Sequence, residues 1–226
     1  MTALPAPVEA VIFDMDGLLL DTERLYREAI VGAAAELGFD FSDAFYQTMI
    51  GVAEKECQAM IASHFGPEFP MAQYLQDCSS RLRQLLRAGI PVKPGATEIL
   101  AELADRTIPK ALATSTHRAT AVRQLHEVGL HQYFKVIVTR EEVTHGKPHP
   151  DLFLKAARDL GVSPQRCVVL EDSYNGIRAA HAAGTMPVMV PDLLAATDEV
   201  CRLCVAVVKD LHEARTLLER TLAQAR

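Results

Sequence analysis

Several features that define common protein classes are missing from this chain, and each absence narrows what the protein can be. No run of about 18 apolar residues occurs, so the sequence predicts no membrane-spanning helix. Glycine and proline number only 12 each in 226 residues, which excludes fibrous and low-complexity chains. The formal net charge is −6, so the broad positive surface of a nucleic-acid-binding protein is absent. Neither a membrane nor a nucleic acid is therefore an expected partner.

Cysteine and N-terminal positive charge are also scarce. The five cysteines, an odd number, indicate reduced thiols rather than a disulfide framework. Their one close pair, Cys201-x-x-Cys204, has no second Cys/His pair nearby and lies in an apolar stretch, which disfavours a metal or redox role. Residues Met1 to Pro7 carry no Lys or Arg, unlike a secretory signal. We therefore expect a cytoplasmic protein, and a monomer.

What the chain does contain is an alternation of short apolar runs and helical stretches. The apolar runs, which we expect to be strands, are Ala10–Phe13, Ala111–Ala113, Val136–Val138, Val168–Leu170, Val188–Val190 and Val205–Val208. Helices are expected between them at Ala119–Val128, Pro150–Leu160 and Tyr174–Ala183. This alternation predicts an α/β fold with a doubly wound, parallel, Rossmann-like sheet that helices cover on both faces.

One segment departs from the alternation. Between Asp21 and about Gly89 no strand is recognisable, and apolar residues recur at helical spacing, as in Leu25, Ala29 and Ala33. About seventy residues of helix are too many for a loop between a strand and a helix. We therefore predict an α/β core domain at 1–20 and 91–226, with an inserted α-helical domain at 21–90. A single irregular α/β domain is the alternative on the pattern alone.

Polar side chains follow four of the predicted strands, and the carboxyl ends of parallel strands are where ligands bind. They are Asp14, Asp16 and Gly17 after the first strand, Thr114, Ser115 and Thr116 after the second, Lys147 after the third, and Glu171 and Asp172 after the fourth. Clustered carboxylates repel one another and need a cation, and hard oxygen ligands suit Mg²⁺. The lysine and the hydroxyls supply the positive charge and donors that a phosphoryl group requires. Helix capping would explain Asp14 alone, but it does not explain the four carboxylates together.

The same residues resemble the four motifs of the haloacid dehalogenase superfamily. The motifs are Asp14-Met15-Asp16-Gly17, Thr114, Lys147 before Pro148, and Glu171-Asp172 before Ser173. Their order and spacing match from about Val8 to Pro191, and the helical insertion is similar to the cap of subfamily I. The most similar branch contains sugar-phosphate phosphatases, pseudouridine-monophosphatase and β-phosphoglucomutase.

The resemblance implies a role for each residue. Asp14 would be the nucleophile that forms an aspartyl-phosphate, and Asp16 the general acid and base. Thr114, the backbone N–H groups from Ser115 onward, and Lys147 would bind the phosphoryl oxygens. The Mg²⁺ ligands would be Asp14, the backbone carbonyl of Asp16, Asp172 and, as a further candidate, Glu171. Ser173 and Asn175 would lie behind them, or would only cap the next helix.

The cap would choose the substrate in such an enzyme. Tyr26 and Gly51 are the substrate-binding candidates there, and Glu23 and Lys55 are further ones; each also has an ordinary explanation as a helix-surface or helix-end residue. Likewise, His117 and Arg118 would contact substrate or only begin a helix.

The implied function is Mg²⁺-dependent hydrolysis of a small phosphorylated metabolite, a sugar phosphate or a nucleotide-like compound. Asp16 favours phosphate monoesters, because dehalogenases of the superfamily lack an aspartate at that position. A phosphomutase of the β-phosphoglucomutase type is one alternative, weakened because Ile50 and Glu54 flank Gly51 where the mutase has a basic pair. A receiver-like signalling domain is the other, but it needs neither a cap nor Asp16.

Overall fold

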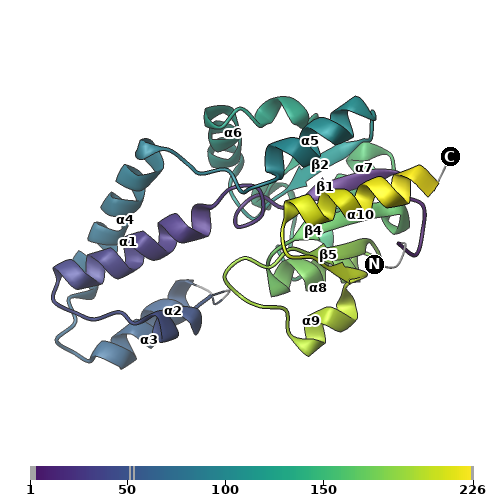
Figure 1. Cartoon of the computed structure of the whole chain (residues 1–226). Coiled ribbons are helices and arrows are strands. Elements are labelled where there is room, and N and C mark those ends of the chain that lie inside the picture. Colours follow the sequence, from purple (N-terminus) through teal and green to yellow (C-terminus); the bar gives the residue numbers. More distant parts are fainter. Residues whose placement is uncertain (1–3, 51, 53, 225–226) are drawn as a thin grey trace. The chain divides into compact units, whose positions relative to one another are not determined.

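The computed structural model describes residues 4–50, 52 and 54–224, which fall into two compact units (Figure 1). One unit joins Met1–Asp21 to Pro91–Arg226, and the other is Thr22–Ile90. We call them the α/β unit and the helical unit. That they act as catalytic domain and cap stays a prediction.

The α/β unit is built on a parallel sheet, which confirms the predicted fold class. Its six strands lie in the order β3-β2-β1-β4-β5-β6. Their bounds are β1 Ala10–Phe13, β2 Lys110–Ala113, β3 Val136–Val138, β4 Cys167–Glu171, β5 Met186–Met189 and β6 Ala206–Val207. The strand order reverses direction at β1, because β2 lies on one side of it and β4 on the other. In doubly wound sheets this is the point where ligands bind.

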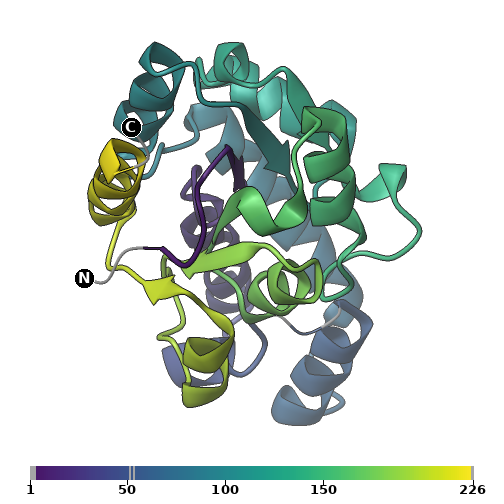
Figure 2. The ribbon, with the colours of Figure 1, turned by 90° about the vertical axis from the view of Figure 1, so that its right-hand side faces the viewer.

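The helices of this unit cover both faces of the sheet. They are α5 Ala96–Asp105, α6 Arg118–Glu127, α7 Asp151–Leu160, α8 Tyr174–Ala182, α9 Asp198–Leu203 and α10 Leu211–Gln224, with short 3₁₀ turns at η1 His131–Tyr133, η2 Arg140–Glu142 and η3 Pro164–Arg166. Figure 2 shows α5 and α10 on one side of the sheet and α7 and α8 on the other. The sequence predicted α6, α7 and α8; α5, α9 and α10 complete the two layers.

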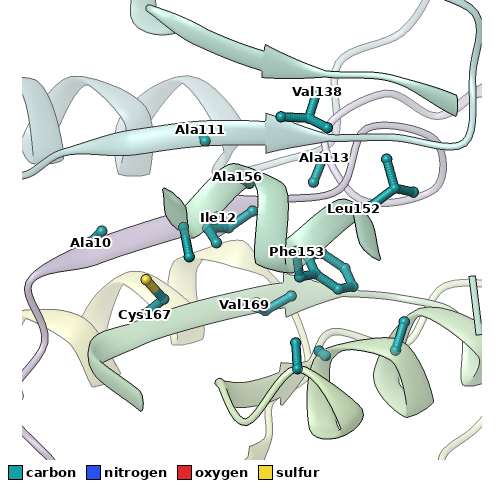
Figure 3. Packing of buried hydrophobic residues seen from close by; sticks show 14 residues of the cluster. Ala10, Ile12, Ala111, Ala113, Val138, Leu152, Phe153, Ala156, Cys167 and Val169 are labelled. Carbon is teal, nitrogen blue, oxygen red and sulfur yellow. The ribbon is translucent and has the colours of Figure 1, made fainter. Parts of the chain in front are cut away.

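The core follows from the alternation of side chains along each strand. Ala10 and Ile12 of β1 face the side covered by α7, where they pack with Leu152 and Phe153 (Figure 3). Phe13 makes an edge-to-face contact with Phe134 at a ring distance of 6.0 Å. All four β1 residues are buried, as both faces of a parallel sheet require. This buried strand fixes the position of the loop that follows it.

Strand β5 begins two residues before the predicted start and includes Pro187. A proline in an inner strand normally removes a hydrogen bond of the sheet. Here the Pro187 carbonyl accepts from the Val205 N–H at 2.8 Å, so the ring nitrogen faces the same side. The neighbouring strand on that side starts only at Ala206, so the proline leaves the ladder to β4 intact. Val190, Val205 and Val208 lie outside the strands.

The helical unit contains α1 Thr22–Glu36, α2 Asp43–Gln47, α3 Glu54–Phe65 and α4 Met71–Ala88. Helices α1 and α4 pack against each other (Figure 1). At Gly32 of α1, a Cβ would lie 2.6 Å from the guanidinium of Arg81 on α4, so the end of this flexible side chain occupies the space beside the glycine. The rings of Phe41, Phe65, Phe69 and Tyr74 pack on one another in stacked, tilted and edge-to-face contacts and form a second part of the core of this unit. Among the helices that the structure describes, none is both long and apolar enough to cross a membrane.

Candidate active site

Three neighbouring strands deliver polar side chains to one edge of the sheet. Asp14 follows β1, Thr114 follows β2, and Glu171 ends β4. Although polar, these residues are only 5%, 1% and 1% exposed. A buried polar or charged group is stable only when its hydrogen bonds are satisfied, so each of these residues needs a partner within the site.

Lys147 provides that partner for the two acids. Its Nζ donates to Glu171 Oε2 at 2.7 Å and also to Asp14 Oδ1. The side chains of Lys147, Asp14 and Glu171 are 7%, 8% and 1% exposed, so the ion pairs are shielded from water. Lys147 was expected to supply positive charge to a phosphoryl group, and the structure brings its ammonium into direct contact with Asp14.

The charges of this cluster do not balance. Burial and the Glu171 carboxylate raise the pKa of Asp14 above its usual range, and the Lys147 ammonium offsets this only in part. Burial lowers the pKa of Lys147, but Asp14 and Glu171 outweigh it and leave that pKa raised, so the ammonium stays protonated. Two buried carboxylates thus share one ammonium, and the site attracts further positive charge.

The loop after β1 is short and closed on itself. The Gly17 N–H donates to the Leu20 carbonyl at 2.8 Å, and the Leu20 N–H donates to the Met15 carbonyl at 3.0 Å. Gly17 has a φ of +80°, and a Cβ there would lie 2.3 Å from Asp172 Oδ2. Only glycine allows both this backbone and the close approach of Asp172.

A group of three acids forms beside this loop. Asp14, Glu171 and Asp172 each offer an oxygen, and these oxygens lie within 4.8 Å of one another. Glu171 is held in place by Ser173, whose N–H and Oγ donate to Oε1 at 3.1 and 2.6 Å. Because a carboxylate has about four lone-pair positions, these bonds leave Glu171 able to bind a cation as well. The donor set, made of hard oxygens only, fits Mg²⁺.

The loop after β2 holds the hydroxyl groups. The Thr114 hydroxyl oxygen accepts from the Thr116 N–H at 3.0 Å, and the Thr116 hydroxyl donates to Asp16 Oδ2 at 2.6 Å. Ser115, between them, is exposed. The sequence analysis counted Thr116 in the hydroxyl cluster but gave it no role. The available signal was its place in the run of three hydroxyl residues, Thr114 to Thr116, that follows the second strand.

His117 and Arg118 turn toward the η2 turn. Arg118 donates from its backbone N–H to Glu141 at 2.8 Å and from its guanidinium to the Ile137 carbonyl at 2.9 Å. His117 Nδ1 lies 3.5 Å from Glu141, and its side chain is largely exposed. Both residues therefore begin α6 and join it to the end of β3.

The candidates of the helical unit lie on two of its helices. Tyr26 is 42% exposed on α1, Glu23 is in the first turn of that helix, and Lys55 is exposed on α3. Gly51 lies outside the described residues. Their contact with a substrate stays a prediction.

The chain is similar in sequence to a family of hydrolases and to two phosphatases. The model of the haloacid dehalogenase-like hydrolase family matches residues 11–190. The chain is 34% identical over 177 residues to the phosphorylated carbohydrates phosphatase of Thermotoga maritima, covering 78% of this chain and 82% of that protein. It is 36% identical over 192 residues to a protein of Drosophila melanogaster described as "Probable pseudouridine-5'-phosphatase", covering 80% of each.

The solved structures give the same fold. A β-phosphoglucomutase of Clostridium difficile superposes with a TM-score of 0.72 at 23% identity, over 96% of this chain and 98% of that one. At this identity the similarity concerns the fold alone.

Fold, acidic edge and relatives together define a class, the hydrolases of phosphoric monoesters that are built on a doubly wound parallel sheet. Within that class, the chain belongs to the haloacid dehalogenase-like hydrolase family.

Proposed function

We propose that this protein is a Mg²⁺-dependent phosphatase that hydrolyses a small phosphorylated metabolite through an aspartyl-phosphate on Asp14. The observation that carries the proposal is the buried Asp14–Lys147–Glu171 cluster, with Asp172 beside it, at the carboxyl edge of the sheet. The relatives named for phosphorylated carbohydrates and for pseudouridine 5'-phosphate support a sugar phosphate or nucleotide-like substrate. The predicted monomeric state and cytoplasmic location stay predictions.

The residues divide the work of binding. Asp14, Glu171 and Asp172 would hold the metal, with the Asp16 carbonyl, and Mg²⁺ bound there would screen the carboxylates from an incoming phosphate. Lys147 adds a fixed positive charge next to the attacked phosphorus, and Thr114 with the N–H groups that follow it binds phosphoryl oxygens. Asp14, Thr114 and Glu171 lie at the ends of β1, β2 and β4, and Lys147 pairs with both acids. These groups therefore need little reorganisation when the substrate binds.

The reaction proceeds in two displacements. An Asp14 carboxylate oxygen forms a bond to phosphorus as the bond to the leaving oxygen breaks, and that oxygen takes a proton from Asp16. Water then attacks the phosphorus, gives its proton to Asp16 and releases Asp14. The cycle needs no redox partner and returns every residue to its starting state.

The experiment compares phosphate release from a panel of sugar phosphates, nucleotides and an aryl phosphate, measured as kcat/KM with Mg²⁺. We expect EDTA to abolish activity and excess Mg²⁺ to restore it. Full activity in EDTA, or no activity on any monoester, contradicts the proposal.

A further inference from the structure

We propose that Thr116 is a positioning residue for Asp16, whose carboxyl group it holds in one orientation for proton transfer. The inference rests on the proposed function, in which Asp16 is the general acid and base. Its basis is the hydrogen bond from the Thr116 hydroxyl to Asp16 Oδ2 at 2.6 Å. This bond joins the loop after β1 to the loop after β2, across residues 100 positions apart.

Thr116 is itself firmly placed. Its N–H donates to the Thr114 hydroxyl oxygen at 3.0 Å, and Thr114 donates its own N–H to the Val138 carbonyl of β3 at 3.0 Å. Thr114 is 1% exposed, so it does not move without disturbing the core. Hydrogen bonds to β2 and β3, which are adjacent strands, therefore fix the position of Thr116 and of its hydroxyl group.

Asp16 has a rigid backbone but a rotatable side chain. Its loop is closed by the hydrogen bonds of Gly17 and Leu20, and the three residues after Gly17 are buried leucines. Its side chain is joined to this backbone by rotatable single bonds, and its hydrogen-bond partners set the rotation about them. A second, immobile hydrogen-bond partner restricts this rotation, and small errors in the placement of a reacting group lower rates steeply.

The hydrogen bond also distinguishes the two carboxyl oxygens. An ionised carboxylate only accepts hydrogen bonds, so Thr116 must be the donor to Oδ2. The proton exchanged with substrate is then carried by Oδ1. When the P–O bond of the ester breaks, the leaving oxygen takes the electron pair and the Oδ1 proton; the attacking water later returns a proton to the same oxygen.

The test begins with Thr116→Val, which has nearly the same shape but no hydroxyl. For a sugar phosphate, whose leaving oxygen needs a proton, we expect kcat to fall by about tenfold to a hundredfold, the effect of one charge-assisted hydrogen bond. For an activated aryl phosphate, which departs without that proton, we expect a much smaller loss. Equal losses on both substrates, or a faster reaction with the sugar phosphate, overturn the inference.

Two variants serve as controls. Thr116→Ser keeps the hydroxyl and should restore the sugar-phosphate rate. Thr185→Val removes a half-buried hydroxyl that donates to the Ala180 carbonyl at 2.8 Å, away from the acidic group, and should leave both rates unchanged. Thermal melting identifies misfolded variants, and Thr116→Ala replaces the valine variant if the latter does not fold.

A double-mutant cycle with Asp16→Asn separates a positioning role from a structural one. If Thr116 acts through Asp16, its removal should cost little once Asp16 can no longer transfer a proton. An undiminished loss from Thr116→Val in the Asp16→Asn background, measured with the sugar phosphate, contradicts the inference. A wild-type protein without Mg²⁺-dependent phosphatase activity instead contradicts the proposed function, before any Thr116 variant is compared.

Discussion

At the scale of single residues, the site buries three charged side chains, Asp14, Lys147 and Glu171, in surroundings from which charges are normally excluded. Removing carboxylates and an ammonium from water costs several kcal/mol per ion, and the mutual attraction of the ions offsets that cost only with good geometry. Lys147 meets both acids, yet the pKa of Asp14 stays raised by burial and by Glu171. Because folding raises the pKa of Asp14 from 3.8 to about 8, this residue makes the metal-free protein lose stability as the pH rises between these two values.

Replacing Asp14 by asparagine separates stability from activity. Without the nucleophilic oxygen, we expect kcat to fall by about 10⁴- to 10⁶-fold, as for other nucleophile deletions. Because asparagine has no carboxyl group whose ionisation the fold opposes, we expect the melting temperature in metal-free buffer at pH 7 to be unchanged or higher. Phosphate release and thermal melting measure the two effects.

Two further measurements test the role of Asp14 as the nucleophile: a control substitution at another aspartate, and labelling with beryllofluoride. Asp159→Asn removes an aspartate that pairs with Lys155 on α7, outside the acidic group, and should leave the rate unchanged. Beryllofluoride should label Asp14 in the wild type and nothing in Asp14→Asn. A label on a different residue contradicts the assignment of the nucleophile.

At the scale of elements, the start of α8 is shaped around Glu171. Ser173 caps the helix by accepting the Gly176 N–H at 3.0 Å, while its hydroxyl donates to Glu171. Gly176 provides the space: a Cβ there would lie 1.9 Å from the Glu171 carboxyl carbon. The first turn of α8 thus packs directly against the Glu171 carboxylate. A glycine is needed at position 176 because Glu171 takes up the space of a side chain there, not because the helix itself needs one.

Gly176→Ala tests this arrangement. Alanine favours a helix by about 1 kcal/mol over glycine, but its methyl group must displace Glu171 from Lys147. We expect a large loss of kcat/KM, and a fall in melting temperature instead of the rise that helix propensity alone predicts. Gly32→Ala is the matched control, since its methyl group meets only the Arg81 side chain, and it should retain activity. Wild-type activity in Gly176→Ala contradicts the role given to this glycine.

At the scale of the whole molecule, the chain leaves and re-enters the α/β unit at one place. Asp21 donates its N–H to the Pro91 carbonyl at 2.8 Å, and Leu20 pairs with Val92 in an antiparallel bridge. Lys93 adds an ion pair with Asp192 at 2.6 Å, in the segment after β5. The helical unit is therefore inserted without interrupting the sheet, because the segment that leaves the α/β unit and the segment that returns to it are hydrogen-bonded to each other.

The charge of the helical segment predicts which acceptor takes the phosphoryl group. A mutase must hold a second phosphate, which needs positive charge, whereas residues 21–89 carry six basic against ten acidic side chains. We expect incubation with β-glucose 1-phosphate and a trace of the bisphosphate to release inorganic phosphate. Efficient formation of glucose 6-phosphate identifies a mutase instead.

The sequence by itself determined the strand ends and the residues placed there. Buried strands such as Ala10–Phe13 are readable because both faces are apolar, and the polar residue that follows each strand marks the edge of the sheet. For the same reason the parallel fold was predictable, as were Asp14, Lys147 and Glu171 as neighbours at one edge. Helices α5, α9 and α10 were not among the predicted helices, although the helical spacing of Ile99, Leu100 and Leu103 in α5 was a readable signal.

Only the tertiary structure decided how those residues meet. The bond between Thr116 and Asp16 joins two loops far apart in sequence, and no local pattern encodes a contact of that kind. Likewise, nothing in the sequence marks Gly176 as unusual. The need for a glycine there becomes visible only in the structure, where the Glu171 side chain lies against it. Local patterns specify which elements form, whereas the orientation of each side chain depends on what the packed chain places beside it.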